Sequence, residues 1–368
     1  MASSDLEAYR TYAMMAKPVG ARCNLACEYC YYRKEHPAAR MSDEVLEAYV
    51  RQTIRMHGSK AVVEFVWHGG EPLLAGRGFF RRAVKLQRMH ADGRTIVNNV
   101  QTNGTLIDEA WAELFAREGF VVGISCDGPH RAHDAYRCDA GGAGSLERVL
   151  AGVAACAKAG VRVDGLCAVH CANVHAPRAL YEFLRGLFPL VQFLPVCDVV
   201  TASGSAHLTD ASVDPDEYGS FLCEMYDAWS EDRPEARPVI SIFEAIGRMR
   251  NGAPAGICEF EPTCGHAGCV ETDGSVYACD RLVDERHLLG NVLHEDLAVL
   301  MERNRPFGIA KLTGLAPECL SCECLRLCFG GCPTKRFAQA SSGVPINVLC
   351  AAYRQLFTHI STKSANAD

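Results

Sequence analysis

Three cysteines near the start of the chain are spaced closely enough to share one metal centre. Cys23, Cys27 and Cys30 form the pattern Cys-x3-Cys-x2-Cys. Thiolates bind zinc, but a structural zinc ion takes four protein ligands, and His36 is the nearby candidate for the fourth. The alternative is a 4Fe-4S cluster held by three thiolates, which leaves one iron free to bind another molecule. The pattern therefore indicates either a zinc site completed by His36 or a catalytic cluster.

Cysteines are also concentrated in the last third of the chain. In a reducing compartment, so many thiols favour metal ligation over disulfides. Cys-x2-Cys pairs are typical of zinc ribbons, whereas two four-ligand iron-sulfur clusters would need eight thiolates. The tail cysteines are Cys258, Cys264, Cys269, Cys279, Cys319, Cys322, Cys324, Cys328, Cys332 and Cys350. We expect the remaining seven, which are scattered, to be ordinary buried thiols.

The composition limits the classes of partner. The chain has 368 residues, 49% hydrophobic and 22% charged, and its net charge of -7 comes without long blocks of one sign. Nucleic acid is therefore not an expected partner. No run approaches the roughly eighteen apolar residues of a membrane span, and the start, MASSDLEAYR, does not resemble a signal peptide. We expect a cytoplasmic protein without a membrane partner.

The elements that must position these residues follow an alternating pattern. Short β-rich runs alternate with helical patterns up to about residue 235, which is typical of βα units around a parallel sheet. A helix is predicted over 42–58, with Ser42 as its N-cap and Gly58 at its end. The six predicted strands are TYAMMAK (11–17), AVVEFVW (61–67), TIVNNVQ (95–101), FVVGIS (120–125), VRVDGLCAV (161–169) and VQFLPV (191–196). Six such units predict a partial (βα)6, TIM-like barrel over residues 1–235.

The loops after these strands combine glycine with polar groups. The cysteine trio follows the first strand, HGGEP the second, TNG the third and CDGP the fourth. Because the carboxyl ends of parallel strands share one edge, these loops are predicted to converge on one site. From about residue 236 the pattern changes to helices, short β signals such as GSVYACD and dense cysteines. A second, cysteine-rich domain is therefore predicted over 236–368, ending in a helix.

The cysteine trio after the first strand of a βα barrel resembles the radical S-adenosylmethionine (SAM) superfamily. This resemblance implies that SAM is the missing ligand and binds the free iron through its amino and carboxyl groups. GGEP resembles the motif that contacts the SAM amino group, and SCDGP resembles the strand end that contacts its ribose. The cofactor-binding residues implied in this way are Tyr29, Gly69, Gly70, Glu71, Ser125, Asp127 and Arg137.

The tail resembles the SPASM extension, which carries two auxiliary 4Fe-4S clusters and would bring the total to three. The resemblance rests on Cys-x2-Cys-x5-Cys-x3-Cys followed by a last cysteine. It implies that the ligands interleave along the chain and leave Cys269 and Cys324 over. The implied ligands of the first auxiliary cluster are Cys258, Cys264, Cys279 and Cys332, and those of the second are Cys319, Cys322, Cys328 and Cys350.

Longer stretches resemble the anaerobic sulfatase-maturating enzymes within the SPASM group. They are QTNGTLIDEAWAELF, GFVVGISCDGPHRAHDAYR, DGSVYACD and LLGNV. The resemblance implies that a deoxyadenosyl radical removes a β-hydrogen from an active-site Cys or Ser of an unfolded sulfatase, within a Cys/Ser-x-Pro-x-Arg motif. The product is formylglycine. An electron donor such as ferredoxin or flavodoxin is the second expected partner.

Three further residues are candidates for roles in the reaction, one through the resemblance and two through their position in the sequence. Asp280 follows the implied ligand Cys279 and matches the residue assigned as base in the family. Tyr32 and His68 flank the implied SAM site and could position the peptide, although a core aromatic and a hydrogen-bonded histidine are the structural alternatives. Two other functions stay open. One is a SPASM peptide maturase that forms a thioether or carbon-carbon crosslink, and the other is a non-catalytic electron carrier.

Overall fold

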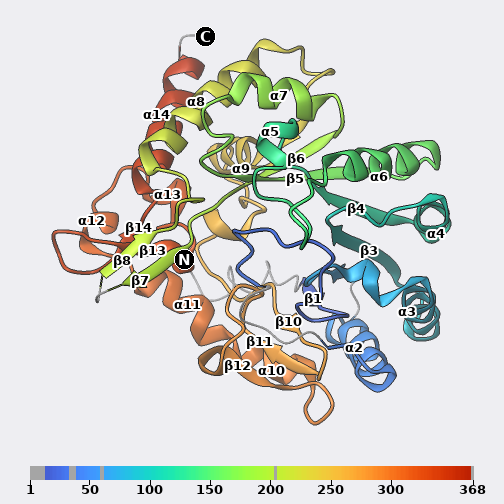
Figure 1. Ribbon diagram of the computed structural model, residues 1–368. Helices are drawn as coiled ribbons and strands as arrows, with labels where there is room; N and C mark the ends of the chain where they lie inside the picture. The colour runs from blue at the N-terminus through green and yellow to red at the C-terminus, as the bar shows by residue number, and fades with distance from the viewer. Residues whose placement is uncertain (1–12, 33–38, 59–61, 203–204, 366–368) are drawn as a thin grey trace.

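A ten-stranded sheet forms the centre of the computed structural model, which describes residues 13–32, 39–58, 62–202 and 205–365 (Figure 1). Its strand order is β12-β11-β10-β1-β2-β3-β4-β5-β6-β9. The six predicted strands form its parallel middle. They are β1 (Met14–Ala16), β2 (Val62–Trp67), β3 (Thr95–Thr102), β4 (Phe120–Ser125), β5 (Val163–Val169) and β6 (Leu190–Pro195). The predicted partial (βα)6 barrel is confirmed.

Helices cover the outer face of these strands (Figure 1). The predicted helix at 42–58 is observed, and its N-cap Ser42 accepts a hydrogen bond from the backbone N–H of Val45 at 3.2 Å. The helices are α2 (Asp43–Met56), α3 (Arg77–His90), α4 (Glu109–Glu118), α6 (Leu146–Lys158), α7 (Pro177–Arg185) and α8 (Pro215–Glu231). Shorter elements between them are η1 (Pro72–Ala75), α5 (His130–His133), β7 (Val199–Ala202) and β8 (Ser205–Leu208).

Aromatic packing fixes the carboxyl end of β2 against its helix. Trp67 is fully buried and makes edge-on contacts with Phe79 and Phe80 of α3. Its indole N–H donates to the Asn98 side chain at 2.8 Å, so its one polar group is satisfied. Burial of each such ring stabilises the fold by roughly 2 kcal/mol. This core holds the next residue, His68, at the edge where the loops converge.

The tail is built from short elements and one long terminal helix. That helix, α14, packs along α8, where His359 lies 2.6 Å from Asp227 (Figure 1). The tail strands are β9 (Val239–Ile240), β10 (Cys269–Val270), β11 (Ser275–Tyr277), β12 (Leu288–Asn291), β13 (Arg336–Ala338) and β14 (Ile346–Asn347). The helical elements are α9 (Ser241–Arg250), η2 (Cys258–Phe260), η3 (Glu285–His287), α10 (Leu297–Arg303), α11 (Arg305–Thr313), α12 (Pro317–Leu320), α13 (Leu325–Cys328), η4 (Pro333–Lys335) and α14 (Cys350–Ala365).

The sheet continues across the predicted boundary at residue 235. Strand β9 extends one edge through β6, and β10 extends the other through parallel pairing with β1, where Met15 faces Cys269. Strands β11 and β12 follow in antiparallel order. Two domains, 1–235 and 236–368, therefore remain a sequence-based prediction. Within the described ranges, no helix combines the length and apolar character needed to cross a membrane.

Candidate active site

The cysteine trio lies in the loop that follows β1, at the carboxyl edge of the sheet. Backbone hydrogen bonds hold this loop, from Ala26 N–H to the Cys138 carbonyl at 2.7 Å and from Gly70 N–H to the Gly20 carbonyl at 2.8 Å. The alternative ligand His36 lies outside the described residues. The loop is thus anchored on both sides, by the segment after α5 and by the GGEP loop.

The environment of the three thiols suits an iron-sulfur cluster. Burial raises the pKa of Cys23 to about 11. Negative charge on Cys27 and Cys30 acts in the same direction, so the three thiols lie close enough to influence one another. A metal centre would keep such thiols deprotonated. The Cys23 sulfur also lies 3.4 Å from Leu25 N–H and 3.7 Å from the Asn103 amide. Donors of this kind stabilise cluster thiolates, so the trio fits a 4Fe-4S cluster.

The two glycines of GGEP allow close packing on the cysteine loop. A Cβ at Gly70 would lie 2.2 Å from the carbonyl oxygen of Arg22, which no side chain could tolerate. Gly69 has φ of +123°, a conformation that favours glycine. The backbone of this loop can therefore approach the cysteine loop and any ligand bound there.

Glu71 joins the GGEP and TNG loops. Its buried carboxylate accepts hydrogen bonds from Leu73 N–H at 3.0 Å, the Thr102 hydroxyl at 2.7 Å and Asn103 N–H at 2.8 Å. Burial raises its pKa to about 7, although these hydrogen bonds act in the opposite direction. These hydrogen bonds to protein donors fix the position of the GGEP loop, whose expected contact with SAM would come from Glu71 or from the glycine backbone. That contact remains a prediction.

Asp127 is the centre of a buried network after β4. Its carboxylate accepts hydrogen bonds from Arg137 Nε at 2.7 Å, from Ala168 N–H at 2.9 Å and from the Tyr29 hydroxyl. Although burial alone would raise its pKa, the Arg137 charge and the hydrogen bonds hold the pKa of Asp127 well below its usual value. The structure thus brings together three of the predicted cofactor-binding residues. Ser125, the last residue of β4, lies at the same edge, and the ribose contact stays a prediction.

Asp280 lies after β11, facing the loop that follows β1. Its carboxylate is 3.1 Å from the Tyr31 hydroxyl, and its backbone carbonyl accepts from Lys17 Nζ at 3.2 Å. Burial opposes ionisation, but the nearby charges of Arg281 and Lys17 and the hydrogen bond from Tyr31 hold the pKa of Asp280 below its usual value. The residue is therefore a carboxylate at neutral pH. It meets the protonation requirement of a base, and its role as the base remains a prediction.

The two candidate substrate residues lie on the same side of the sheet as Asp280. Burial lowers the pKa of His68 to about 4, and its Nδ1 is buried without a hydrogen-bond partner in the described part of the chain. Tyr32 is 2% exposed, and its hydroxyl donates to the Glu271 carboxylate at 2.7 Å. Lys17 Nζ lies 3.7 Å above the Tyr32 ring and 3.3 Å from Glu271. The sequence analysis missed Lys17 and Glu271, although a lysine ending an apolar strand is a recognisable signal.

The first predicted set of auxiliary ligands comes together from three separate segments of the tail. Negative charge on Cys332 and Cys264 raises the pKa of Cys258, after the larger effect of burial, and Cys332 and Cys258 act in the same way on Cys279. The buried Lys311 ammonium supports this group, because it donates to the carbonyls of Cys258, Glu259 and Glu261. Lys311 is another residue that the sequence analysis missed.

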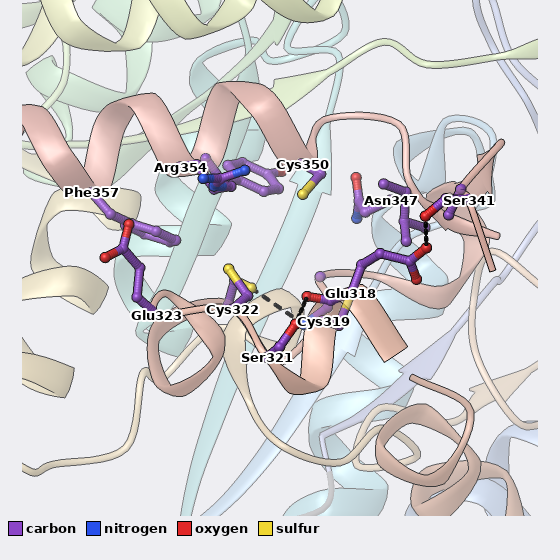
Figure 2. Close-up of a pocket in the computed structure, with 16 residues that line it drawn as sticks. Glu318, Cys319, Ser321, Cys322, Glu323, Ser341, Asn347, Cys350, Arg354 and Phe357 are labelled. Carbon is purple, nitrogen blue, oxygen red and sulfur yellow. Dashed lines mark hydrogen bonds between the residues drawn. The ribbon is translucent and has the colours of Figure 1, made fainter. Parts of the chain in front are cut away.

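The second predicted set lines a single cavity of about 590 Å³ between α12, α13 and α14 (Figure 2). The sulfur-bearing residues are Cys319, Cys322, Cys328 and Cys350. Figure 2 shows Cys322 and Cys350 on opposite walls, with Arg354 and Phe357 projecting from α14. Asn347 also lines this cavity, and its amide nitrogen is buried without a partner among the described residues. An unsatisfied N–H donor beside four thiols fits a bound cluster.

Of the two surplus cysteines, Cys269 lies apart from both sets and Cys324 lies beside the second set. Cys269 is fully buried in β10, where its charged neighbours are Lys17, Glu271 and Asp280. Cys324 lies next to Cys322 at the edge of the second set. In the ranges that the structure describes, no three Cys, His, Asp or Glu side chains are arranged to hold a single metal ion. The division into two sets of four remains a prediction.

Comparisons with known proteins agree over nearly the whole chain. Residues 18–184 match the model of the radical SAM superfamily. A serine-type anaerobic sulfatase-maturating enzyme of Bacteroides thetaiotaomicron is 37% identical over 370 residues, covering 95% of this chain and 89% of the relative. A cysteine-type anaerobic sulfatase-maturating enzyme of Clostridium perfringens is 32% identical, covering 96% and 97%. The solved structure of native anSMEcpe with bound AdoMet and Kp18Cys peptide has a TM-score of 0.87 and 32% identity, covering 96% of this chain and 98% of that chain.

Proposed function

This chain belongs to the anaerobic sulfatase-maturating enzymes of the radical SAM superfamily, and we propose that it oxidises an active-site Cys or Ser of a sulfatase to formylglycine. The observation that carries this proposal is the position of Asp280. An ionised, half-buried carboxylate lies between the cysteine loop after β1 and the first cysteine set of the tail. A substrate side chain that reaches this point meets both a proton acceptor and the radical-forming site.

The enzyme uses SAM and a 4Fe-4S cluster, and Cys23, Cys27 and Cys30 are the residues that fit this cluster. When bound, the two groups supply a deoxyadenosyl radical that removes a hydrogen atom from the substrate β-carbon. We infer two further clusters, which would supply an acceptor for the second electron of the oxidation. Tyr29 and Arg137, oriented by Asp127, and the backbone of Gly69 and Gly70 are the proposed contacts for SAM.

Asp280 would complete the oxidation by taking a proton. After loss of one hydrogen atom, the substrate must still release one electron and the proton of its thiol or hydroxyl. A Ser substrate then gives the aldehyde directly, whereas a Cys substrate gives a thioaldehyde that water hydrolyses to the aldehyde with release of hydrogen sulfide. The Tyr31 hydroxyl fixes one carboxylate oxygen of Asp280. The ionised carboxylate can therefore act as the general base. Tyr32 and His68 would position the peptide, Tyr32 through its ring rather than through its hydroxyl, which is committed to Glu271.

The proposed macromolecular substrate is an unfolded sulfatase segment with the Cys/Ser-x-Pro-x-Arg motif. The proposed electron source is a small redox protein such as ferredoxin or flavodoxin, and no nucleic acid or membrane takes part. We place the reaction in the cytoplasm. The twenty cysteines, all within the described ranges, form no disulfide with one another, and so many unpaired cysteines favour metal ligation in a reducing compartment.

The test is an anaerobic incubation of the reconstituted protein with SAM, dithionite and a synthetic peptide that carries either Cys or Ser in the motif. We expect deoxyadenosine together with a peptide whose Cys or Ser has become formylglycine, as measured by mass spectrometry. A peptide with Ala at that position is the matched control and should stay unmodified. A crosslinked peptide would instead support a peptide maturase, and SAM cleavage without any peptide product would contradict the proposal.

A further inference from the structure

Arg336, the first residue of β13, lies between the two cysteine sets of the tail. Its guanidinium interacts electrostatically with cysteines of both sets. These are Cys264 and Cys332 from the first set, and Cys319 and Cys328 from the second. Two neighbouring cations differ in this respect. Lys311 interacts with cysteines of the first set, and Arg354 interacts with Cys350 of the second.

The guanidinium also holds the segment that links the two sets. Residues Phe329, Gly330 and Gly331 join Cys328 to Cys332, and their φ angles of +45°, +72° and +62° are all left-handed. Three successive residues in this conformation need external support, above all at Phe329, because its side chain disfavours positive φ. Arg336 supplies that support through hydrogen bonds to the Gly330 and Phe329 carbonyls, both at 3.1 Å.

The shape of this linker aims a backbone donor at a sulfur atom. Gly330 N–H lies 3.4 Å from the Cys328 sulfur. A Cβ at Gly330 would lie 2.8 Å from Arg336 Nη2, so the guanidinium packs directly on the glycine. The remaining arm of Arg336 donates to the Lys311 carbonyl at 2.8 Å. Arg336 therefore connects the 329–331 linker to Lys311, whose ammonium group donates to the Cys258 carbonyl.

The positive charge of Arg336 is not neutralised locally. Its hydrogen bonds all go to backbone carbonyls, and no carboxylate pairs with it within the described ranges. A guanidinium stays protonated at neutral pH even when it is partly buried. A fixed charge in a region of low dielectric acts strongly on nearby redox centres.

We propose that Arg336 raises the reduction potentials of both auxiliary clusters and so makes them a better acceptor for the second electron. This inference rests on the proposed function, because it assumes that both cysteine sets hold clusters. A cluster becomes more negative when it accepts an electron, so a nearby positive charge and N–H donors to its cysteine sulfurs stabilise the reduced state. Arg336 provides the positive charge to both cysteine sets and maintains the N–H donor to the sulfur of Cys328.

The test is a redox titration of the reconstituted full chain, followed by electron paramagnetic resonance, with iron content measured first. In Arg336→Gln we expect both auxiliary potentials to fall while the potential of the SAM cluster stays unchanged. A tenfold change in the ratio of reduced to oxidised cluster at a given potential corresponds to about 59 mV for one electron. Arg336→Lys retains the charge and should restore most of both shifts. Arg354→Gln is the matched control and should shift one auxiliary potential.

Each other outcome has a definite meaning. Full iron content with neither or only one potential shifted in Arg336→Gln would overturn the proposal. If Arg336→Gln loses iron, the Arg336→Lys variant decides. Full iron content with unchanged potentials in Arg336→Lys supports the proposal. Iron loss or lowered potentials in that variant would show that the charge is not the cause. Wild-type protein with about four irons would instead overturn the two-cluster premise, which the wild-type measurement alone reveals.

Discussion

The Tyr31 hydroxyl lies 3.1 Å from Oδ2 of Asp280 and so connects the cysteine loop after β1 to the residue that follows Cys279. This contact joins the two cysteine-bearing parts of the chain at the proposed site of proton transfer. Lys17 reinforces it through the Asp280 carbonyl. Asp280 is therefore held in place by the loop after β1, which is far from it in the sequence.

Asp280→Asn should separate radical formation from product formation. The amide keeps the size of the side chain but cannot accept the substrate proton, so formylglycine should fall by a factor on the order of a hundred or more. Deoxyadenosine from SAM should still form. Both products are measured in one reaction, and Asp216→Asn, an exposed position on α8, is the control. If both products fall together, Asp280 supports the site structurally and is not the base.

Iron content should distinguish ligands from surplus thiols. Three 4Fe-4S clusters predict about twelve irons in the reconstituted protein, and Cys279→Ser or Cys328→Ser should each lose about four. Cys269→Ser and Cys324→Ser are the matched controls and should keep the full content. Loss of the metal should also destabilise the tail, because small metal-bound regions fold with their metal. Iron loss in either control would contradict the assignment of ligands.

Gly70→Ala should disrupt the cysteine loop. The new methyl group would lie 2.2 Å from the Arg22 carbonyl oxygen, so one of the two loops must move. We expect a loss of SAM cleavage of at least tenfold, measured as deoxyadenosine under dithionite, because a small displacement is enough to misalign a reactive centre. Gly78→Ala is the control, since a Cβ there meets no atom within 4 Å. Equal activity of the two variants would show that the loops tolerate the displacement.

Acid should destabilise the segment around Asp127 through His133. Burial, helped by the Arg137 charge, lowers the pKa of His133 to about 4, and its ring accepts a hydrogen bond from Asp127 N–H. Because the folded pKa lies below the unfolded value, the stability is present above about pH 6.5 and is lost as pH falls toward 4. At pH 5 this amounts to about 2 kcal/mol relative to pH 8.

The measurement for His133 is urea unfolding of the wild type and of His133→Gln at several pH values. The variant should lose less stability between pH 8 and pH 5 than the wild type does. His68 also has a lowered pKa, of about 4, and contributes in the same window in both proteins, so the difference isolates His133. Parallel pH profiles for the two proteins would contradict the assignment.

Local sequence signals were enough to predict the barrel. The six strands and the helix capped by Ser42 follow from apolar patterns and capping residues, which act over a few positions. The joining of the tail to the sheet was not predicted, because β10 has two residues and its partner β1 is chosen by tertiary packing. The contacts of Lys17 with Glu271 and of Arg336 with the 329–331 linker were not predicted either, because they also depend on tertiary packing.

The predicted site residues are positioned in ways that motifs alone do not reveal. Glu71 and Asp127 fall in loops matched to SAM contacts, yet their carboxylates bind protein donors and orient neighbouring loops. Each pattern marks a loop at the carboxyl end of a strand, because glycine and polar residues are typical of strand ends. Which atom of the loop remains available for a ligand depends on hydrogen bonds between loops that are distant in sequence.

The pairing of β1 with β10 has a consequence for how this protein is made. Strand β1 leaves the ribosome long before its second neighbour, which lies at Cys269 and Val270. Until then one edge of β1 is open, and open edges attract other strands. The nascent chain thus carries the cysteine loop beside an unfinished sheet, and translation of the tail closes that edge.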